Sequence, residues 1–435
     1  MLQKFLKYVL QSVAGMIGIS IYILADTYFI SVYSGADGLA VLNLILPVYG
    51  LMFAIGSMIG IGSATRYRIS RARGETADFY FMQAVIWTLF VSVPFMIVGI
   101  TAPDKLLGLL GADTGLVRLG RNYLRIVLIA APFFMLQYTF TAFARNDNAP
   151  STAMMASIAG SMFNILFDYI FMFPMKMGFP GAALATAMSP VITMAVCSTH
   201  YFSKKNQVPF RIGKLSLRQI TSCCQLGISA FVGEISSAVI TIVFNMLVLG
   251  IAGNIGIAAY GVVANLSAVA MSIFNGMAQG VQPLISESYG KGEGELVRKL
   301  LRWGICTCLL LEIIVVGSVF GMTDMLIGIF NSEENRQLIS YAHPGLRLYF
   351  LGFLIAGINI LLVAYFSAVD DALPAIIGSL MRGAVAIIIC AVVLAHFFGM
   401  NGVWISFLAS EVITFCTILI ISHRKHGRSV ARTKE

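Results

Sequence analysis

Residues 9–33 read VLQSVAGMIGISIYILADTYFISVY, an apolar run in which Asp26 is the one charged side chain. A helix needs about 20 such residues to cross a hydrocarbon core about 30 Å thick, so this run predicts a membrane span. Similar runs recur along the chain of 435 residues. We therefore predict an all-α integral membrane protein with about 12 transmembrane helices. The expected spans are 9–33, 39–65, 79–101, 119–144, 151–173, 181–202, 226–250, 257–285, 300–322, 341–366, 374–397 and 401–422.

The composition and the placement of charge agree with this class. Hydrophobic residues make up 58% of the chain, charged residues 11%, and the mean hydropathy is +0.86. The net charge of +9 comes from lysines and arginines between the apolar runs, where they indicate topology and not nucleic-acid binding. Their distribution predicts a multi-pass protein of the cell membrane with both termini in the cytoplasm. The seven cysteines include the pairs Cys223 and Cys224, and Cys306 and Cys308, and neither pair has a histidine or carboxylate beside it at metal-ligand spacing. We therefore interpret the cysteines as small buried hydrophobes.

An internal repeat divides the chain into two halves. When the chain is aligned with itself without a gap, a first set of residues in the first half matches a second set in the second half; both sets are given at the end of this paragraph. A further block aligns GFPG at 178–181 with GMNG at 399–402. Each half holds an even number of helices, which predicts two six-helix lobes related by a pseudo-twofold axis along the membrane normal. The predicted parts are an N-lobe (1–203), a cytoplasmic linker (204–218), a C-lobe (219–422) and a basic cytoplasmic tail (423–435). The first set is Gly35, Gly38, Ala40, Gly62, Ser70, Gly74, Glu75 and Tyr123, and the second is Gly253, Gly256, Ala258, Gly280, Ser288, Gly292, Glu293 and Tyr341.

Two carboxylates lie deep in predicted N-lobe spans. Asp26 and Asp168 each fall about 17 residues into a span, or about 25 Å at 1.5 Å per residue, so they share one depth. Asn164 lies one helical turn before Asp168, and Thr186 lies near the start of the next span. A charge inside the bilayer costs at least about 2.5 to 3.5 kcal/mol, so such groups need a partner, a proton or a wet cavity.

These four residues predict a coupling site in the N-lobe. Asp26, Asn164 and Asp168 offer the oxygen ligands that Na+ prefers, and a carboxyl in so apolar a setting can also hold a proton near neutral pH. The choice between the two ions stays open. In the alternative interpretation, Asp168 bonds neighbouring backbone and Asp26 only faces a water-filled vestibule.

Further carboxylates lie in the C-lobe spans. Glu234, about 8 residues into its span, either has a substrate or proton role or lies near the cytoplasmic interface. Glu312 and Glu411 lie near the middles of their spans, where we favour neutral, hydrogen-bonded carboxyls. Glu287, near the inner end of its span, is expected to be solvated.

Short motifs in both halves resemble those of one transporter family. LADTYF occupies 24–29, GADGLA follows at 35–40, NILFD occupies 164–168, and QGVQP occupies 279–283 with YG at 289–290. In this order and spacing they resemble the MATE family of multidrug and toxic compound extrusion transporters, and the resemblance covers essentially the full chain.

The resemblance implies a V-shaped exporter of organic cations and amphipathic drugs, driven by inward flow of Na+ or H+. It implies an N-lobe cation site at Asp26, Asn164, Asp168 and Thr186, and it matches Glu234 to a carboxylate that some members use. Gln282, in QGVQP, is a further candidate for a substrate or proton role. Residues 341–366 lack the aspartate of the NorM-like branch, so a C-lobe cation site of that type is not implied. No catalytic residue is expected, and no cofactor beyond the coupling ion.

We expect antiport by alternating access, in a monomer whose partners are small amphipathic or cationic molecules and the lipid bilayer. The main alternative is a flippase for lipid-linked intermediates, which would need a basic cavity, and the spans hold few basic residues apart from Arg125 and Arg382 near their ends. An intramembrane enzyme would need a nucleophile and base or a metal motif, which the five histidines do not supply. A passive channel would need neither the duplication nor the buried carboxylates.

Overall fold

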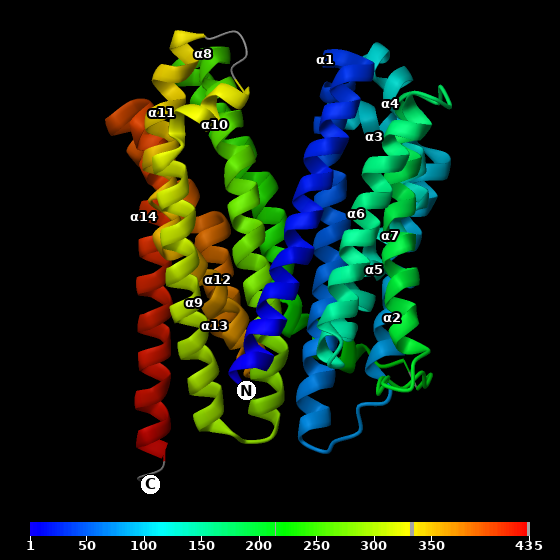
Figure 1. Ribbon diagram of the computed structural model, residues 1–435, viewed down its shortest axis with the longest axis vertical. Coiled ribbons are helices and arrows are strands. Elements are labelled where there is room, and N and C mark those ends of the chain that lie inside the picture. The colour runs from blue at the N-terminus through cyan, green and yellow to red at the C-terminus, as the bar shows by residue number, and fades with distance from the viewer. Residues whose placement is uncertain (214, 331–334, 433–435) are drawn as a thin grey trace.

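The computed structural model describes residues 1–213, 215–330 and 335–432, with the backbone alone from residue 423 onward. The side chains of the predicted basic tail (423–435) and Lys214 of the predicted linker lie outside this description. Within the described residues, every regular element is a helix, and the helices form two bundles (Figure 1). The first contains α1 (Leu2–Ala72), α2 (Tyr80–Thr101), α3 (Pro103–Leu109), α4 (Thr114–Ile129), α5 (Ala131–Asn146), α6 (Pro150–Met172) and α7 (Phe179–Tyr201). The second contains α8 (Leu217–Gly290), α9 (Gly294–Gly321), α10 (Thr323–Phe330), α11 (Arg336–Phe350), α12 (Phe353–Ala368), α13 (Ala372–Leu380), the π-helical turn η1 (Met381–Val385) and α14 (Ala386–Arg432).

The spans agree with the all-α membrane fold predicted from the sequence. In the described part of the chain, nine helical segments are long and apolar enough to cross a membrane, and eleven when each bent pair is one span. One of the nine, Ala372–Ser422, contains a break at Gly399 and is far longer than one crossing requires, so it supplies two passages. The total is then the predicted twelve. Both ends of α1 lie at the lower end of Figure 1, and α1 turns back at its upper end.

The two bundles repeat the same backbone irregularities, which confirms the internal repeat. Gly35 breaks α1 with φ 59°, and its counterpart Gly253 breaks α8 with φ 62°. Gly178 and Gly399, aligned in the second block, also share a positive φ, 61° and 56°. The bend between α4 and α5 is 43°, and that between α11 and α12 is 45°. Only glycine adopts these positive φ values without strain, which explains why these glycines recur in both halves.

Each bundle has its own apolar core, but the start of α1 packs with the other bundle. Tyr123 stacks on Phe179 in the first bundle, and Tyr349 stacks on Phe407 in the second, with ring centroids 4.4 Å apart in both pairs. Phe5 is fully buried and meets Trp303 of α9 edge-on, with centroids 5.8 Å apart. The first turns of α1 therefore tie the N-terminal bundle to the C-terminal one.

Two close helix contacts join the bundles, and the internal repeat relates them. A Cβ atom on Gly62 of α1 would lie 2.1 Å from the Cys223 carbonyl oxygen of α8. On Gly280 of α8 it would lie 2.7 Å from the Tyr8 carbonyl oxygen of α1. Gly62 and Gly280 are repeat partners, so the same small residue permits close backbone approach on both sides of the pseudo-twofold axis.

The segment between the bundles is held against the first one. Its described residues, 202–213 and 215–216, form no helix, and its extent is close to the predicted 204–218. The Gln207 backbone N–H donates to Asp147 Oδ2 at 2.9 Å, and Arg211 Nη1 lies 2.9 Å from Asp78 Oδ2. This crossing stretch therefore rests on the lower end of the N-terminal bundle.

Candidate functional site: a cavity between the bundles and two buried polar clusters

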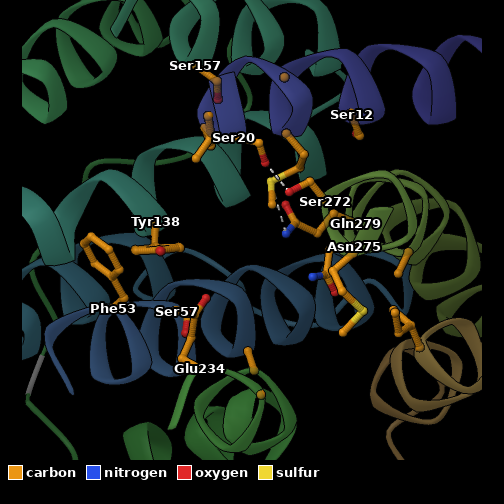
Figure 2. Close-up of a pocket in the computed structure, with 18 of the residues that line it drawn as sticks. Ser12, Ser20, Phe53, Ser57, Tyr138, Ser157, Glu234, Ser272, Asn275 and Gln279 are labelled. Carbon is orange, nitrogen blue, oxygen red and sulfur yellow. Dashed lines mark hydrogen bonds between the residues drawn. The ribbon is translucent and has the colours of Figure 1, made fainter. Parts of the chain in front are cut away.

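A cavity of about 460 Å³ lies between the bundles and receives side chains from both (Figure 2). Ser12 and Ser57 of α1 and Tyr138 of α5 line it from the first bundle, and Asn275 and Gln279 of α8 line it from the second. Its size is in the range of small-molecule sites. The charged residues in its wall, among those the structure describes, are Arg145, Glu234, Arg382 and Glu411.

The four predicted N-lobe residues come together beside this cavity. Asp26 of α1 and Asp168 of α6 face each other closely enough for one carboxyl to bond the other when one holds a proton. Asn164 Nδ2 donates to Thr186 Oγ1 at 3.1 Å, which joins α6 to α7. All four side chains are buried, and none of them lines the cavity itself.

Several oxygens of this N-lobe site lack protein partners. Oδ1 of Asp26, Oδ1 of Asn164 and both carboxylate oxygens of Asp168 are buried without a hydrogen-bond partner among the described residues. A buried polar atom without a partner is costly, so these oxygens are suited to a bound cation or a proton. Two carboxylates and an amide are hard oxygen ligands of the kind Na+ binds. The residues present therefore fit either of the two predicted ions.

Sequence reasoning missed the tyrosines around this site. Tyr22 lines the cavity and lies on the same helix as Asp26. Deeper in the bundle, the hydroxyls of Tyr49 and Tyr123 lie 3.3 Å apart. Tyr22 precedes Asp26 by four residues on α1. This one-turn spacing places both side chains on one face of the helix, and it is the feature of the sequence from which Tyr22 could have been predicted.

The remaining two candidates lie between the bundles. Glu234 of α8 forms part of the cavity wall (Figure 2). Gln282 of α8 also lines the cavity, and its Nε2 donates to Thr65 Oγ1 of α1 at 3.1 Å. Gln282 thus bridges the two bundles.

A second polar cluster, centred on Glu411 of α14, lies in the C-terminal bundle. Arg382 of η1 donates from Nη2 to Glu411 Oε1 at 2.9 Å and from Nε to the same oxygen at 3.2 Å. Asn359 of α12 donates to Glu411 Oε2 at 2.7 Å. Glu312 of α9 accepts from the Ile358 backbone N–H at 3.0 Å. Both carboxyls are hydrogen-bonded as predicted, but Glu411 has an arginine partner, so its interpretation as a neutral carboxyl is wrong.

The sequence did not predict the pair of Arg382 and Glu411. Arg382 was expected near the end of a span, whereas the structure places it in the cavity wall beside a carboxylate that is 1% exposed. A π turn at η1 shifts the helix register at Arg382, and hydropathy alone does not show such a turn.

At the lower end, ion pairs join the bundles. Glu287 of α8 lies 3.1 Å from Lys4 Nζ, 2.6 Å from Arg68 Nη2 of α1 and 2.8 Å from Lys291 Nζ. We call this group the Glu287 cluster. Glu287 is therefore only partly solvated, with its side chain 21% exposed, and it is the shared acceptor of three basic residues. Asp370 and Arg66, 2.8 Å apart, form a second pair between the bundles nearby.

The fold and the site together define a class: a polytopic membrane protein with two repeated helical bundles around a central cavity, as in transporters that bind substrate between two halves. A family model described as MatE matches residues 12–170 and 230–393, one segment in each bundle. The chain belongs to the MatE family, which confirms the resemblance found in its motifs.

Its relatives are transporters. The multidrug export protein MepA of Staphylococcus aureus (strain NCTC 8325 / PS 47) is 26% identical over 422 residues, which cover 95% of this chain and 92% of that protein. MepA of Staphylococcus saprophyticus is 26% identical over 408 residues, 92% of this chain and 89% of that protein.

Solved structures share the fold. An outward-facing multidrug resistance MATE family transporter of the MOP superfamily superposes with a TM-score of 0.91 at 22% identity, covering 99% of this chain and 96% of that one. A MOP superfamily transporter from Pyrococcus furiosus gives 0.87 at 22% identity, covering 96% and 95%. These likenesses extend over nearly the whole length of both chains.

Proposed function

We propose that this chain is a secondary active exporter that exchanges amphipathic or cationic drugs for Na+ or H+. The unpartnered oxygens of Asp26, Asn164 and Asp168 are the observation that carries this proposal. They offer a buried site for one small cation next to a cavity large enough for a drug. The MepA relatives, which are named multidrug export proteins, support the drug as the second ligand.

One helix provides a physical route for coupling. The stretch of α1 before Gly35 carries Asp26, lines the cavity with Ser12, Ser20 and Tyr22, and buries Phe5 in the other bundle. A cation that draws Asp26 and Asp168 together acts on this same helix. Cation binding can therefore change both the shape of the cavity and the contact between bundles.

The lower end is the side that we propose to face the cytoplasm. The arginines that follow the second span and the basic residues around Glu287 gather there, as the positive-inside tendency requires. The ion pairs then close the cavity toward the cytoplasm in this conformation, and alternating access requires them to separate. One cation moving through a potential of 100 mV supplies about 2.3 kcal/mol for this cycle. Because one chain contains both bundles and the whole cavity, we propose that a monomer transports.

The flippase alternative has less support. A cavity for lipid phosphates should be basic, whereas Arg145 and Arg382 in this wall are matched by Glu234 and Glu411. Glu411 also neutralises Arg382 directly. The balanced wall favours amphipathic substrates over polyanionic headgroups.

The test is transport by purified protein in proteoliposomes. An imposed Na+ or H+ gradient should drive movement of a fluorescent organic cation, and Asp26→Asn and Asp168→Asn should each reduce gradient-driven transport by at least about tenfold, because each removes a negative ligand. Asp324→Asn, which alters a carboxylate that is 91% exposed, serves as the control.

The outcomes separate the possibilities. Loss in both variants with the control unchanged supports the coupling site, and the effective gradient identifies the ion. Full transport in both variants would mean that Asp26 and Asp168 do not couple transport to the ion. Coupling would then depend on Glu234, or the proposal of ion-coupled transport would be refuted. Failure of the unaltered protein to move the drug favours the flippase.

A further inference from the structure

Two turns at the lower end share a backbone conformation that glycine would adopt more easily than the residues they carry. Among the described residues with a positive φ, seven are glycines and three are not: Asn148, Lys176 and Asp370, at 61°, 53° and 59°. Asn148 lies midway between α5 and α6, and Asp370 lies at the same place between α12 and α13. Asparagine and aspartate tolerate this conformation better than most side chains, but glycine adopts it freely. A role of the two side chains would explain why neither position is a glycine.

Each of these turns accepts a hydrogen bond from an arginine near the end of α1. Arg68 Nη2 donates to Asn148 Oδ1 at 2.9 Å. Arg66 Nη1 donates to Asp370 Oδ2 at 2.8 Å. Arg68 Nη2 also donates to Glu287 Oε2 at 2.6 Å, and the Arg68 side chain is only 5% exposed. Asn148 therefore binds, within the N-terminal bundle, the guanidinium that pairs with the C-terminal bundle.

The turn that carries Asn148 is held in place by its neighbour Asp147. The Asp147 side chain is fully buried at the end of α5. Its Oδ2 lies 2.9 Å from His200 Nε2 and accepts the Gln207 backbone N–H at 2.9 Å. The hydroxyl of Tyr8, on α1, donates to Asn148 Oδ1 at 3.1 Å. Contacts from α1, α7 and the crossing stretch thus fix the position of the Asn148 side chain.

These contacts differ in what must happen to them when the lower end opens. The pairs of Arg68 with Glu287 and of Arg66 with Asp370 cross between the bundles, so both pairs must separate. The bond between Arg68 and Asn148 lies within one bundle and can persist. A guanidinium that stays oriented loses less side-chain entropy each time it recovers its partner. The bond to Asn148 therefore favours the closed arrangement.

We propose that Asn148 is a positioning residue of the transport cycle, which keeps Arg68 oriented for Glu287 so that the lower end recloses on the same ion pair. Because the Asn148 amide is neutral, it holds the guanidinium without replacing Glu287 as the charged partner. This inference rests on the proposed function, since it takes the lower end as a closure that opens during transport.

The experiment measures the separation of the bundles in detergent by pulsed electron paramagnetic resonance, without drug or ion gradient. Spin labels replace Glu75 and Glu293, exposed residues of two loops at the lower end, in a background without the seven native cysteines. Asn148→Gly suits the same backbone conformation and removes the acceptor oxygen. Lys176→Gly, at the exposed third non-glycine residue with a positive φ, is the matched control.

We expect Asn148→Gly to raise the population with a long distance between the labels about fivefold, the effect of losing one hydrogen bond, and Lys176→Gly to leave it unchanged. Asn148→Asp, which tolerates the same φ and keeps an acceptor, should restore the native distribution. An unchanged distribution in Asn148→Gly would overturn the inference. So would equal opening in Lys176→Gly, or an Asn148→Asp variant as open as Asn148→Gly.

A double-mutant cycle tests whether Asn148 acts through Arg68 and Glu287. With Glu287→Gln already present, Asn148→Gly should add little, because the partner for which Arg68 is positioned has lost its charge. An undiminished effect in that background would overturn the positioning role. Transport of a fluorescent organic cation by the unaltered protein is assayed separately. If that transport fails under both gradients while the distance changes persist, the proposed function is refuted and the positioning of Arg68 by Asn148 stands.

Discussion

At the scale of single residues, the buried carboxylates differ in what offsets their charge. Asp26 and Asp168 face each other with unpartnered oxygens, whereas Glu411 has Arg382. Glu312 accepts from the Ile358 backbone N–H, and its Oε2 has no partner among the described residues. The sequence showed the depth of each carboxylate, because depth follows from its position along an apolar run. It did not show the partners, which come from other helices.

This difference predicts unequal stability effects of the same substitution. Glu411→Gln removes the negative charge beside Arg382, and breaking a buried ion pair by changing one partner costs about 3 kcal/mol or more. Glu312→Gln keeps an acceptor for the Ile358 N–H and separates no ion pair. Thermal unfolding in detergent should show a clearly lower midpoint for Glu411→Gln and a small change for Glu312→Gln. A larger loss in Glu312→Gln would contradict this account of the cluster.

At the scale of elements, the contact of α1 with α8 depends on glycines, because the lack of a side chain permits the close approach. Gly280 lets the α8 backbone approach Tyr8, and Gly62 does the same on the other side. The repeat identified both positions in the sequence, but not their reason. That reason appears only when the two helices are in contact.

A methyl group at Gly280 should therefore force α1 and α8 apart. Gly280→Ala places a Cβ against the Tyr8 and Val9 backbone, and overpacking of this kind typically costs about 1 to 3 kcal/mol. Gly261→Ala, on the same stretch of α8 after the break at Gly253, meets no atom within 4 Å and should not destabilise the protein.

Spin labels at the repeat partners Glu75 and Glu293, in a background without the seven native cysteines, would report the separation of the bundles at the lower end. We expect a longer or broader distance distribution in Gly280→Ala and the native distribution in Gly261→Ala. An unchanged distribution and unfolding midpoint in Gly280→Ala would show that the close contact is not needed to hold this conformation.

At the scale of the whole molecule, two bundles meet around a cavity and are joined at the lower end by the Glu287 cluster and the pair of Arg66 and Asp370. If the cavity opens alternately to the two sides, these ion pairs favour the conformation described here and oppose the other. Their strength then sets the balance between the two states.

Weakening the Glu287 cluster should shift that balance. Glu287→Gln removes the carboxylate shared by Lys4, Arg68 and Lys291, so the lower end should open severalfold more often. Glu293→Gln, at an exposed position of the adjoining loop, is the matched control. The opening is measured with a cysteine placed at Ser57, in the cavity wall. An impermeant thiol reagent is added on the lower side, and the extent of labelling reports how often this side opens. Equal labelling in both variants would exclude the cluster as a closing element.

The membrane class, the span positions, the duplication and the shared depth of Asp26 and Asp168 could all be predicted from the sequence. Each of these follows from hydropathy, periodicity or residue identity along the chain, and the bilayer acts on every span in the same way. The folded arrangement was needed to show that Arg382 pairs with Glu411, that Glu287 is a shared acceptor and that Glu234 faces a cavity between bundles. Such pairings depend on how neighbouring helices rotate, bend and approach each other, and the glycine breaks, the paired bends and the π turn set those relations between segments far apart in the chain.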